Sequence, residues 1–161
     1  MALVSNPMLP ACMGGVLLAA SLLTAAGGAE VAPPNPRLAR EDRALKAVCA
    51  KCHNLEIVMS TPMSYDDWHD TVQKMVDRGA SGSDEQFDDV MDYLHRTMTT
   101  INVNTALADE LEIVLNVSAT TAQAIIARRS TQKFTGLADL KSVAGVDAST
   151  VEAKARLIFF K

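Results

Sequence analysis

Apolar residues recur at steps of three and four along residues 38–98, and this period constrains the fold more than any other feature. Such steps place side chains on one face of an α-helix, whereas a half-buried strand needs strict alternation. No long stretch shows that alternation, and aromatic residues make up only 4 % of the 161 residues. A β-sandwich, a collagen-like chain and a disordered chain are therefore poor fits. The sequence predicts an all-α protein, with room for one ordinary domain or two small ones.

The first 29 residues carry no charged side chain, and residues 13–29 are apolar and small. This composition is typical of an export signal, with cleavage expected after Ala29 and with Gly27 at the minus-three position. The first alternative is an uncleaved membrane anchor, because about 18 uncharged residues can span a bilayer. The second is a buried helix of the fold. We expect residues 1–29 to lie outside the fold and the bacterial protein to be periplasmic.

Charge divides the remaining sequence near Thr100. Residues 30–100 hold 13 acidic and 8 basic side chains, a net charge of −5, whereas residues 101–161 hold 6 and 7, a net charge of +1. The shift predicts two modules, at residues 38–100 and 101–161, after an extended proline-rich linker at residues 30–37. The mild overall acidity argues against nucleic-acid binding along the whole chain, which needs a basic surface.

Both modules are expected to be helical. In the first, we predict one helix at about residues 38–54, a second from Ser64 to Gly79 and a third that begins at Ser83. Their apolar stripes predict the core residues Leu45, Val48, Trp68, Val72, Val76, Phe87, Val90, Met91, Leu94 and Met98.

Four helices are expected in the second module, at residues 105–115 after Asn104, 122–129 after Thr120 or Thr121, 137–143, and 149–160 from Ser149. Residues 115–126 and 143–154 share one pattern, in which small residues around a valine precede a capping residue and a helix. This repeat predicts a duplicated unit of helix, tight turn and helix.

The motif Cys-Ala-Lys-Cys-His at residues 49–53 is the most specific chemical pattern in the chain. Two thiols on one helical turn can form thioether bonds to the two vinyl groups of one haem, and the imidazole of His53 then reaches the iron. Such attachment takes place outside the cytoplasm, which agrees with the predicted export. The motif therefore predicts one covalently bound haem c, held by Cys49, Cys52 and His53.

Three other uses of the two cysteines are less favoured. A thioredoxin-like pair expects a preceding strand in a βαβ unit, which this sequence lacks. A zinc site needs further ligands, and only His69 and His95 remain. A disulfide at this spacing within a helix is strained.

Residues 38–99 resemble a small monohaem c-type cytochrome of the kind that accompanies periplasmic dehydrogenases. The resemblance includes the cysteine motif, residues 68–80 (WHDTVQKMVDRGA) and the pair Tyr93 and Leu94. It implies a class I-like cytochrome c bundle, in which the terminal helices cross and Tyr93 packs on the haem-bearing helix.

The same resemblance implies a distal methionine ligand somewhat fewer than twenty residues before that aromatic residue. Met75 precedes Tyr93 by 18 residues and is the expected ligand. An open distal site is an alternative, and the other candidate ligands are Met59, Met63, Met91, Met98, His69 and His95. The last two methionines fit the core stripe, and both histidines lie at polar helix positions, where we expect them to be solvated.

Residues 101–161 resemble the helix-hairpin-helix pair of competence-type DNA receptors. The resemblance rests on residues 101–106 (INVNTA), 109–111 (DEL), Ala122, Ile125, Ile126, Arg128, Phe134, 137–140 and 143–146 (VAGV). DNA-binding members have a Gly-hydrophobic-Gly hairpin, whose backbone N–H groups meet a phosphate. Here the hairpins contain Asn116 and Ser118, then Gly145 and Asp147, so three of four glycines are absent. We expect a docking or stabilising module, with DNA binding disfavoured.

The leading hypothesis is a periplasmic electron carrier, not an enzyme, that exchanges electrons with a dehydrogenase or terminal oxidase. An envelope-associated DNA-binding protein with an accessory haem is the alternative, and a small haem enzyme or gas sensor is a third class if the distal site is open. A membrane partner is expected only if the amino-terminal segment is uncleaved.

Overall fold

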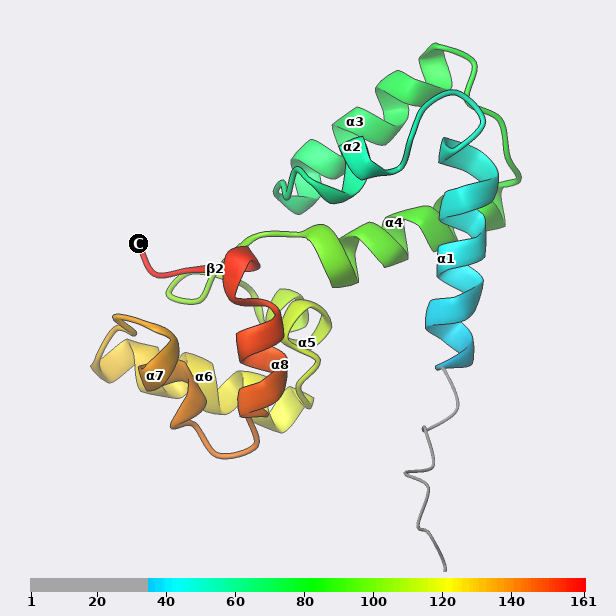
Figure 1. Cartoon of the computed structure of the whole chain (residues 1–161). Helices are drawn as coiled ribbons and strands as arrows, with labels where there is room; N and C mark the ends of the chain where they lie inside the picture. The colour runs from blue at the N-terminus through cyan, green and yellow to red at the C-terminus, as the bar shows by residue number, and fades with distance from the viewer. Residues whose placement is uncertain (1–34) are drawn as a thin grey trace, which may run out of the picture. The chain divides into compact units, whose positions relative to one another are not determined.

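The computed structural model describes residues 35–161. These residues are mostly helical, and their only strands, β1 and β2, are two residues long, so the prediction of an all-α fold is confirmed (Figure 1). The predicted signal or anchor at residues 1–29 lies outside the described residues. Among the helices of residues 35–161, none combines the length and the apolar character that a membrane crossing requires.

The first module contains helices α1 (Pro36–Cys49), α2 (Glu56–Met59), α3 (Tyr65–Asp77) and α4 (Asp84–Met98). Ser64 caps α3 and Ser83 forms a capping box with Gln86 on α4, as the sequence predicts. Gly79 has a φ of 98° and ends α3. The first helix is shorter than predicted because α1 ends at Cys49, so that the following turn carries Cys52 and His53.

Helix α1 packs mainly on α4, and α3 packs on the same helix (Figure 1). Glu41 of α1 is buried and forms ion pairs with Arg37, at 2.7 Å, and with Arg96 of α4, at 3.4 Å. Tyr93 of α4 is partly buried and lies near Asp42 of α1. The fully buried apolar residues of this module are Ala44, Leu45, Val48, Trp68, Val90, Leu94 and Met98.

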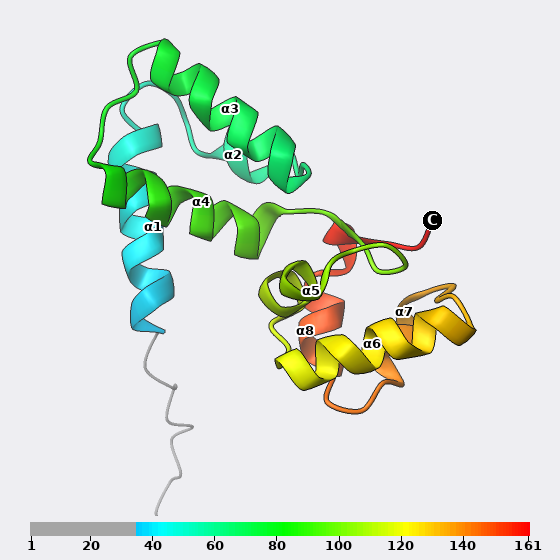
Figure 2. The ribbon, with the colours of Figure 1, turned by 180° about the vertical axis from the view of Figure 1, so that it is seen from behind.

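The second module contains β1 (Ile101–Asn102), α5 (Ala108–Leu115), α6 (Ala119–Thr131), α7 (Leu137–Lys141), α8 (Ala148–Ala153), the short 3-10 helix η1 (Ala155–Leu157) and β2 (Ile158–Phe159). The two strands pair in parallel, with Ile101 opposite Ile158. Figure 2 shows α5 and α6 side by side. The predicted single helix over residues 149–160 is wrong, because the chain leaves α8 after Ala153 and ends as a strand.

The predicted cap at Asn104 is also wrong. Its side-chain amide donates to Phe134 O and accepts from Phe134 N, each at 2.9 Å, while α5 begins only after Leu107. Ser118, and not Thr120 or Thr121, caps α6. Asp147 caps α8 in place of Ser149.

The predicted duplication is confirmed. Asn116 and Gly145 are both left-handed, with φ values of 54° and 87°, and a valine and a capping residue follow each of them. The repeated units α5–α6 and α7–α8 share one core, made of Ile101, Val103, Ala106, Leu111, Val114, Leu115, Ala122, Ile125, Phe134, Leu140, Val143, Val151 and Ile158.

Candidate cofactor site and the carboxy-terminal hairpins

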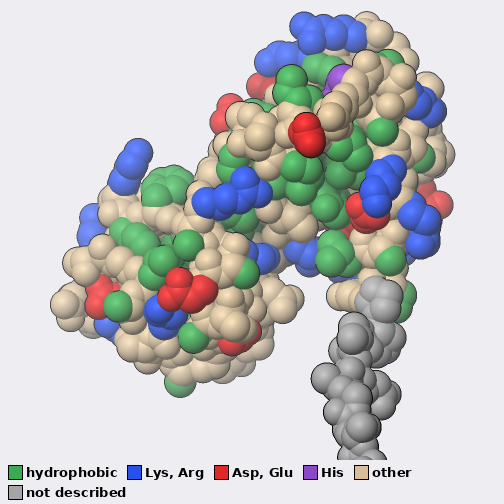
Figure 3. All heavy atoms as spheres, viewed as in Figure 1, with side chains coloured by type: hydrophobic (Ala, Val, Ile, Leu, Met, Phe, Trp, Pro, Cys, Tyr) green, Lys and Arg blue, Asp and Glu red, His purple; other side chains and the backbone are tan. Residues whose placement is uncertain are grey.

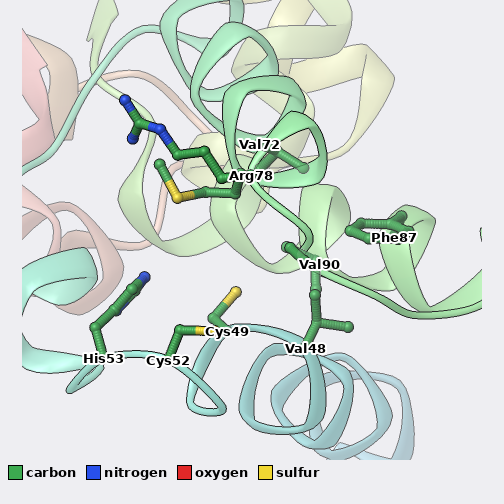
Figure 4. A pocket seen from close by; sticks show the side chains of 10 residues that line it. Val48, Cys49, Cys52, His53, Val72, Arg78, Phe87 and Val90 are labelled. Carbon is green, nitrogen blue, oxygen red and sulfur yellow. The ribbon is translucent and has the colours of Figure 1, made fainter.

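The end of α1 and the turn after it bring Cys49, Cys52 and His53 to one side of a cavity. Figure 4 shows the side chains of Cys49 and His53 directed toward the side of the cavity that carries Val72 and Arg78, with Cys52 beside them on the same segment. Both cysteines are free thiols. His53 Nδ1 lies 3.3 Å from the backbone oxygen of Asn54. A proton on Nδ1 would be shared with that oxygen, which leaves the lone pair of Nε2 available to a metal.

The cavity beside the motif has a volume of about 300 Å³ and is bounded by Val48, Cys49, Cys52, His53, Val72, Met75, Arg78, Ala80, Phe87 and Val90. A second cavity, of about 410 Å³, is bounded by Cys49, His53, Ile57, Val58, Thr61, Met63, Trp68, Thr71, Val72, Met75, Arg78 and Leu94. Five shared residues make the two cavities contiguous. Apolar side chains gather over α1, α2 and α4 on the face that Figure 3 displays. Each cavity has the volume of a small-molecule or cofactor pocket, about 300–1,000 Å³.

Met75 is the methionine that borders both cavities. Met63 borders the larger one. Met98 is fully buried in the core, Met91 packs against that core, and neither borders either cavity. The structure thus places Met75 in the same cavity as the cysteine motif.

Arg78 supplies the only permanently charged side chain in the two linings as the structure describes them. It follows α3, which ends at Asp77, and its guanidinium forms no ion pair within residues 35–161. Sequence reasoning missed this residue, although it stands in the segment 68–80 that carries the resemblance. A single cation beside an apolar cavity suits a largely apolar molecule with acidic groups at one edge.

The chemistry of this donor set fits haem better than the alternatives. Burial raises the pKa of the Cys49 thiol, whereas a redox-active cysteine needs a lowered pKa. Within residues 35–161 no three His, Cys, Asp or Glu side chains are grouped as a metal site, which disfavours structural zinc there. Two thiols, an imidazole and a thioether around an apolar cavity match a covalently attached haem.

The two other histidines differ from each other. His69 is exposed, as expected. The prediction that His95 is solvated is wrong: its Nε2 is buried without a hydrogen-bond partner, and its ring lies 4.5 Å from that of Tyr65. Burial lowers the pKa of His95, and the nearby carboxylates of Asp109 and Glu110 oppose this shift.

The second hairpin keeps its glycine because of packing. A Cβ atom on Gly145 would collide with Thr121 Oγ1 of the first hairpin unit. After it, the carboxylate of Asp147 accepts hydrogen bonds from the backbone and hydroxyl groups of Ser149 and Thr150, which lower its pKa to about 2. This hairpin is therefore anionic at neutral pH.

Most basic side chains of the second module already have partners inside the molecule. Arg129 donates to Val103 O at 2.8 Å, and Lys141 pairs with Glu152. Arg128 bonds Ser142 and lies 5.1 Å from the ring centre of Phe134. Few cations remain for an external anion.

Residues 97–158 match the family model of the helix-hairpin-helix motif, in agreement with the resemblance of residues 101–161. No curated protein and no solved structure has significant similarity to the chain. The carboxy-terminal module is thus a helix-hairpin-helix domain.

Proposed function

We propose that the protein carries one covalently attached haem c in the contiguous cavities and serves as an electron carrier. The observation that carries this proposal is the convergence of Cys49, Cys52, His53 and Met75 on the same apolar cavity. The cavity bears one guanidinium, from Arg78, which suits the two carboxylates of a haem.

Each residue has a defined task in this proposal. The thiols of Cys49 and Cys52 each add across a vinyl double bond, sulfur to one carbon and the proton to the other, so no group leaves. His53 offers Nε2 as the proximal ligand, and its Nδ1 lies by the Asn54 carbonyl that would fix the tautomer. Met75 offers its sulfur as the distal ligand.

Bound haem supplies a one-electron change between ferrous and ferric iron. The apolar residues Val48, Val72 and Val90 line the cavity and would limit the access of water to a haem bound there. If His53 and Met75 both held the iron, no ligand position would remain for a substrate, which favours outer-sphere electron transfer over catalysis.

The partners and the compartment follow from this chemistry. Attachment to a Cys-x-x-Cys-His motif occurs outside the cytoplasm, and the uncharged apolar start of the sequence is consistent with export to the periplasm. We propose a dehydrogenase or terminal oxidase as the redox partner.

The test is removal of the two thiols. The Cys49→Ala/Cys52→Ala protein, produced in the periplasm with c-type maturation, should retain no haem after acid–acetone extraction, whereas the wild type should retain it. Covalent haem in the double variant would contradict the proposal.

A DNA-binding protein of the cell envelope with an accessory haem is the second candidate, and the helix-hairpin-helix domain favours it. The charges of the carboxy-terminal module argue against DNA binding. Affinity for duplex DNA depends largely on counterion release by free cations, and this module has a net charge of only +1. Asp147 also places a negative charge at the hairpin where a phosphate would bind.

A titration of the full chain with labelled duplex at about 0.15 M salt separates the two candidates. We expect no micromolar binding. Salt-sensitive binding that is lost in the Lys133→Gln/Lys161→Gln variant would favour the DNA-binding candidate, because neither ammonium group donates a hydrogen bond within residues 35–161.

A further inference from the structure

Two cations of the carboxy-terminal domain reach into the first module. Arg156, in η1, donates from Nη1 to Met59 O at 3.2 Å and from Nη2 to Met98 Sδ at 3.2 Å. Met59 is the last residue of α2 and Met98 is the last residue of α4. One guanidinium thus links the ends of two helices of the first module to the helix-hairpin-helix domain.

Lys154, directly before η1, also links the helix-hairpin-helix domain to α4. Its Nζ donates to Arg96 O, at 2.9 Å, in the last turn of α4, and to Val114 O in the last turn of α5. A cation between two helix carboxy termini is stabilised by their free carbonyl groups and by the negative ends of their dipoles. Burial lowers the pKa of Lys154 to about 8, so the group is still mostly charged at neutral pH.

Helix α2 needs an outside support. It is four residues long and contains no buried residue, so packing alone holds it weakly. Ile57 and Val58 of this helix nevertheless form part of the wall of the larger cavity. The position of α2 therefore affects the shape of the cavity.

The segment between α2 and α3, residues 60–64, is hydrogen-bonded to the end of α4 and the residues just after it. Met63 N donates to Met98 O at 3.3 Å, and Thr100 N donates to Met63 O at 2.8 Å. The indole of Trp68 donates to Met98 O at 3.1 Å. Met98, at the end of α4, thus accepts hydrogen bonds from Met63 and Trp68 at its backbone oxygen and from Arg156 at its sulfur.

We propose that Arg156, anchored by Lys154, braces the α2 wall of the cofactor cavity, so that the helix-hairpin-helix domain is a structural part of the site. The brace itself follows from the contacts above, while its effect on haem rests on the proposed function. It gives this domain a role that requires no nucleic acid.

Amide hydrogen exchange in the full chain tests the brace without reference to haem. In Arg156→Gln, the amides of Ser60 and Met63 should exchange at least about fivefold faster than in wild type, because a charge-assisted bond to the wall is lost. Val103, whose amide donates to Phe159 O within the carboxy-terminal domain, should keep its rate. Lys133→Gln is the control with the same change of charge.

Unchanged rates at Ser60 and Met63 in Arg156→Gln would overturn the proposal. So would an equal acceleration at Val103, because Arg156 would then stabilise only its own domain. In haem-loaded protein, Arg156→Gln should also lose the spectral signature of methionine ligation at a lower temperature than Lys133→Gln. A chain without covalent haem would refute the proposed function and leave the exchange result decisive for the brace.

Discussion

Met75 differs from the other methionines in bordering both cavities, and its replacement tests the distal ligand. Ferric haem with a thioether ligand has a weak near-infrared band and a higher potential than bis-histidine haem. Met75→Ala should abolish the band and lower the potential. Met63→Ala removes a thioether from the larger cavity alone and should keep the band. The opposite result, with the band lost only in Met63→Ala, would assign the ligand to Met63.

Arg78 should raise the reduction potential of a haem in this cavity. A nearby positive charge disfavours the more positive ferric state, so Arg78→Gln should lower the midpoint potential in a spectroelectrochemical titration. Arg43→Gln is the matched control, because Arg43 is exposed on α1 and lies outside both linings. Equal shifts in the two variants would show that only net charge matters.

The sequence predicts single residues where the chemistry of a motif fixes their spacing. The cysteine motif led directly to Cys49, Cys52 and His53, and the structure places all three on one cavity. Arg78 was missed and the burial of His95 was predicted wrongly, because both depend on what surrounds these residues in space. An exposed arginine and a half-buried histidine have no distinct spacing in the sequence.

At the scale of elements, the two hairpins should respond differently to substitution. Gly145→Ala combines a left-handed φ of 87° with a collision at Thr121 and should cost about 1–3 kcal/mol of unfolding free energy. Asn116→Gly removes a side chain from a left-handed position that glycine also accepts, and should change stability by less than about 1 kcal/mol. Urea unfolding followed by circular dichroism measures both. Similar losses in the two variants would contradict this account.

His95 predicts a loss of stability in acid. Its pKa in the folded protein lies below the usual 6.5, so the unfolded chain takes up the proton first as the pH falls below 6.5. The unfolding free energy should therefore decrease over that range. In His95→Phe, which keeps a ring beside Tyr65, the decrease should be smaller, whereas His69→Gln should match wild type. Identical pH profiles for His95→Phe and wild type would exclude this contribution.

Local signals at helix ends identified the caps of α3 and α4 but misplaced those of α6 and α8 by two or three residues. Ser64 and Ser83 cap their helices because each side chain reaches a nearby backbone N–H group. Asn104 failed as a cap because its amide bonds Phe134, which is distant in sequence. The paired strands β1 and β2 are too short to have any period, and their pairing joins the two ends of the domain.

At the scale of the whole molecule, the change of charge near Thr100 coincides with a boundary between two cores. One hydrophobic cluster contains residues up to Met98, and the other begins at Ile101. The sequence could not predict that Lys154 and Arg156 connect the two modules, because those contacts depend on the tertiary arrangement. The same contacts use cations that a DNA-binding domain would keep free.

The pyridine haemochrome spectrum of the full chain, purified from periplasmic expression with c-type maturation, tests the central claim most directly. We predict a spectrum of the c type that persists after acid–acetone extraction, with one haem per chain. A chain that reaches the periplasm folded but without covalent haem would contradict the account and leave the helix-hairpin-helix domain as the basis of its function.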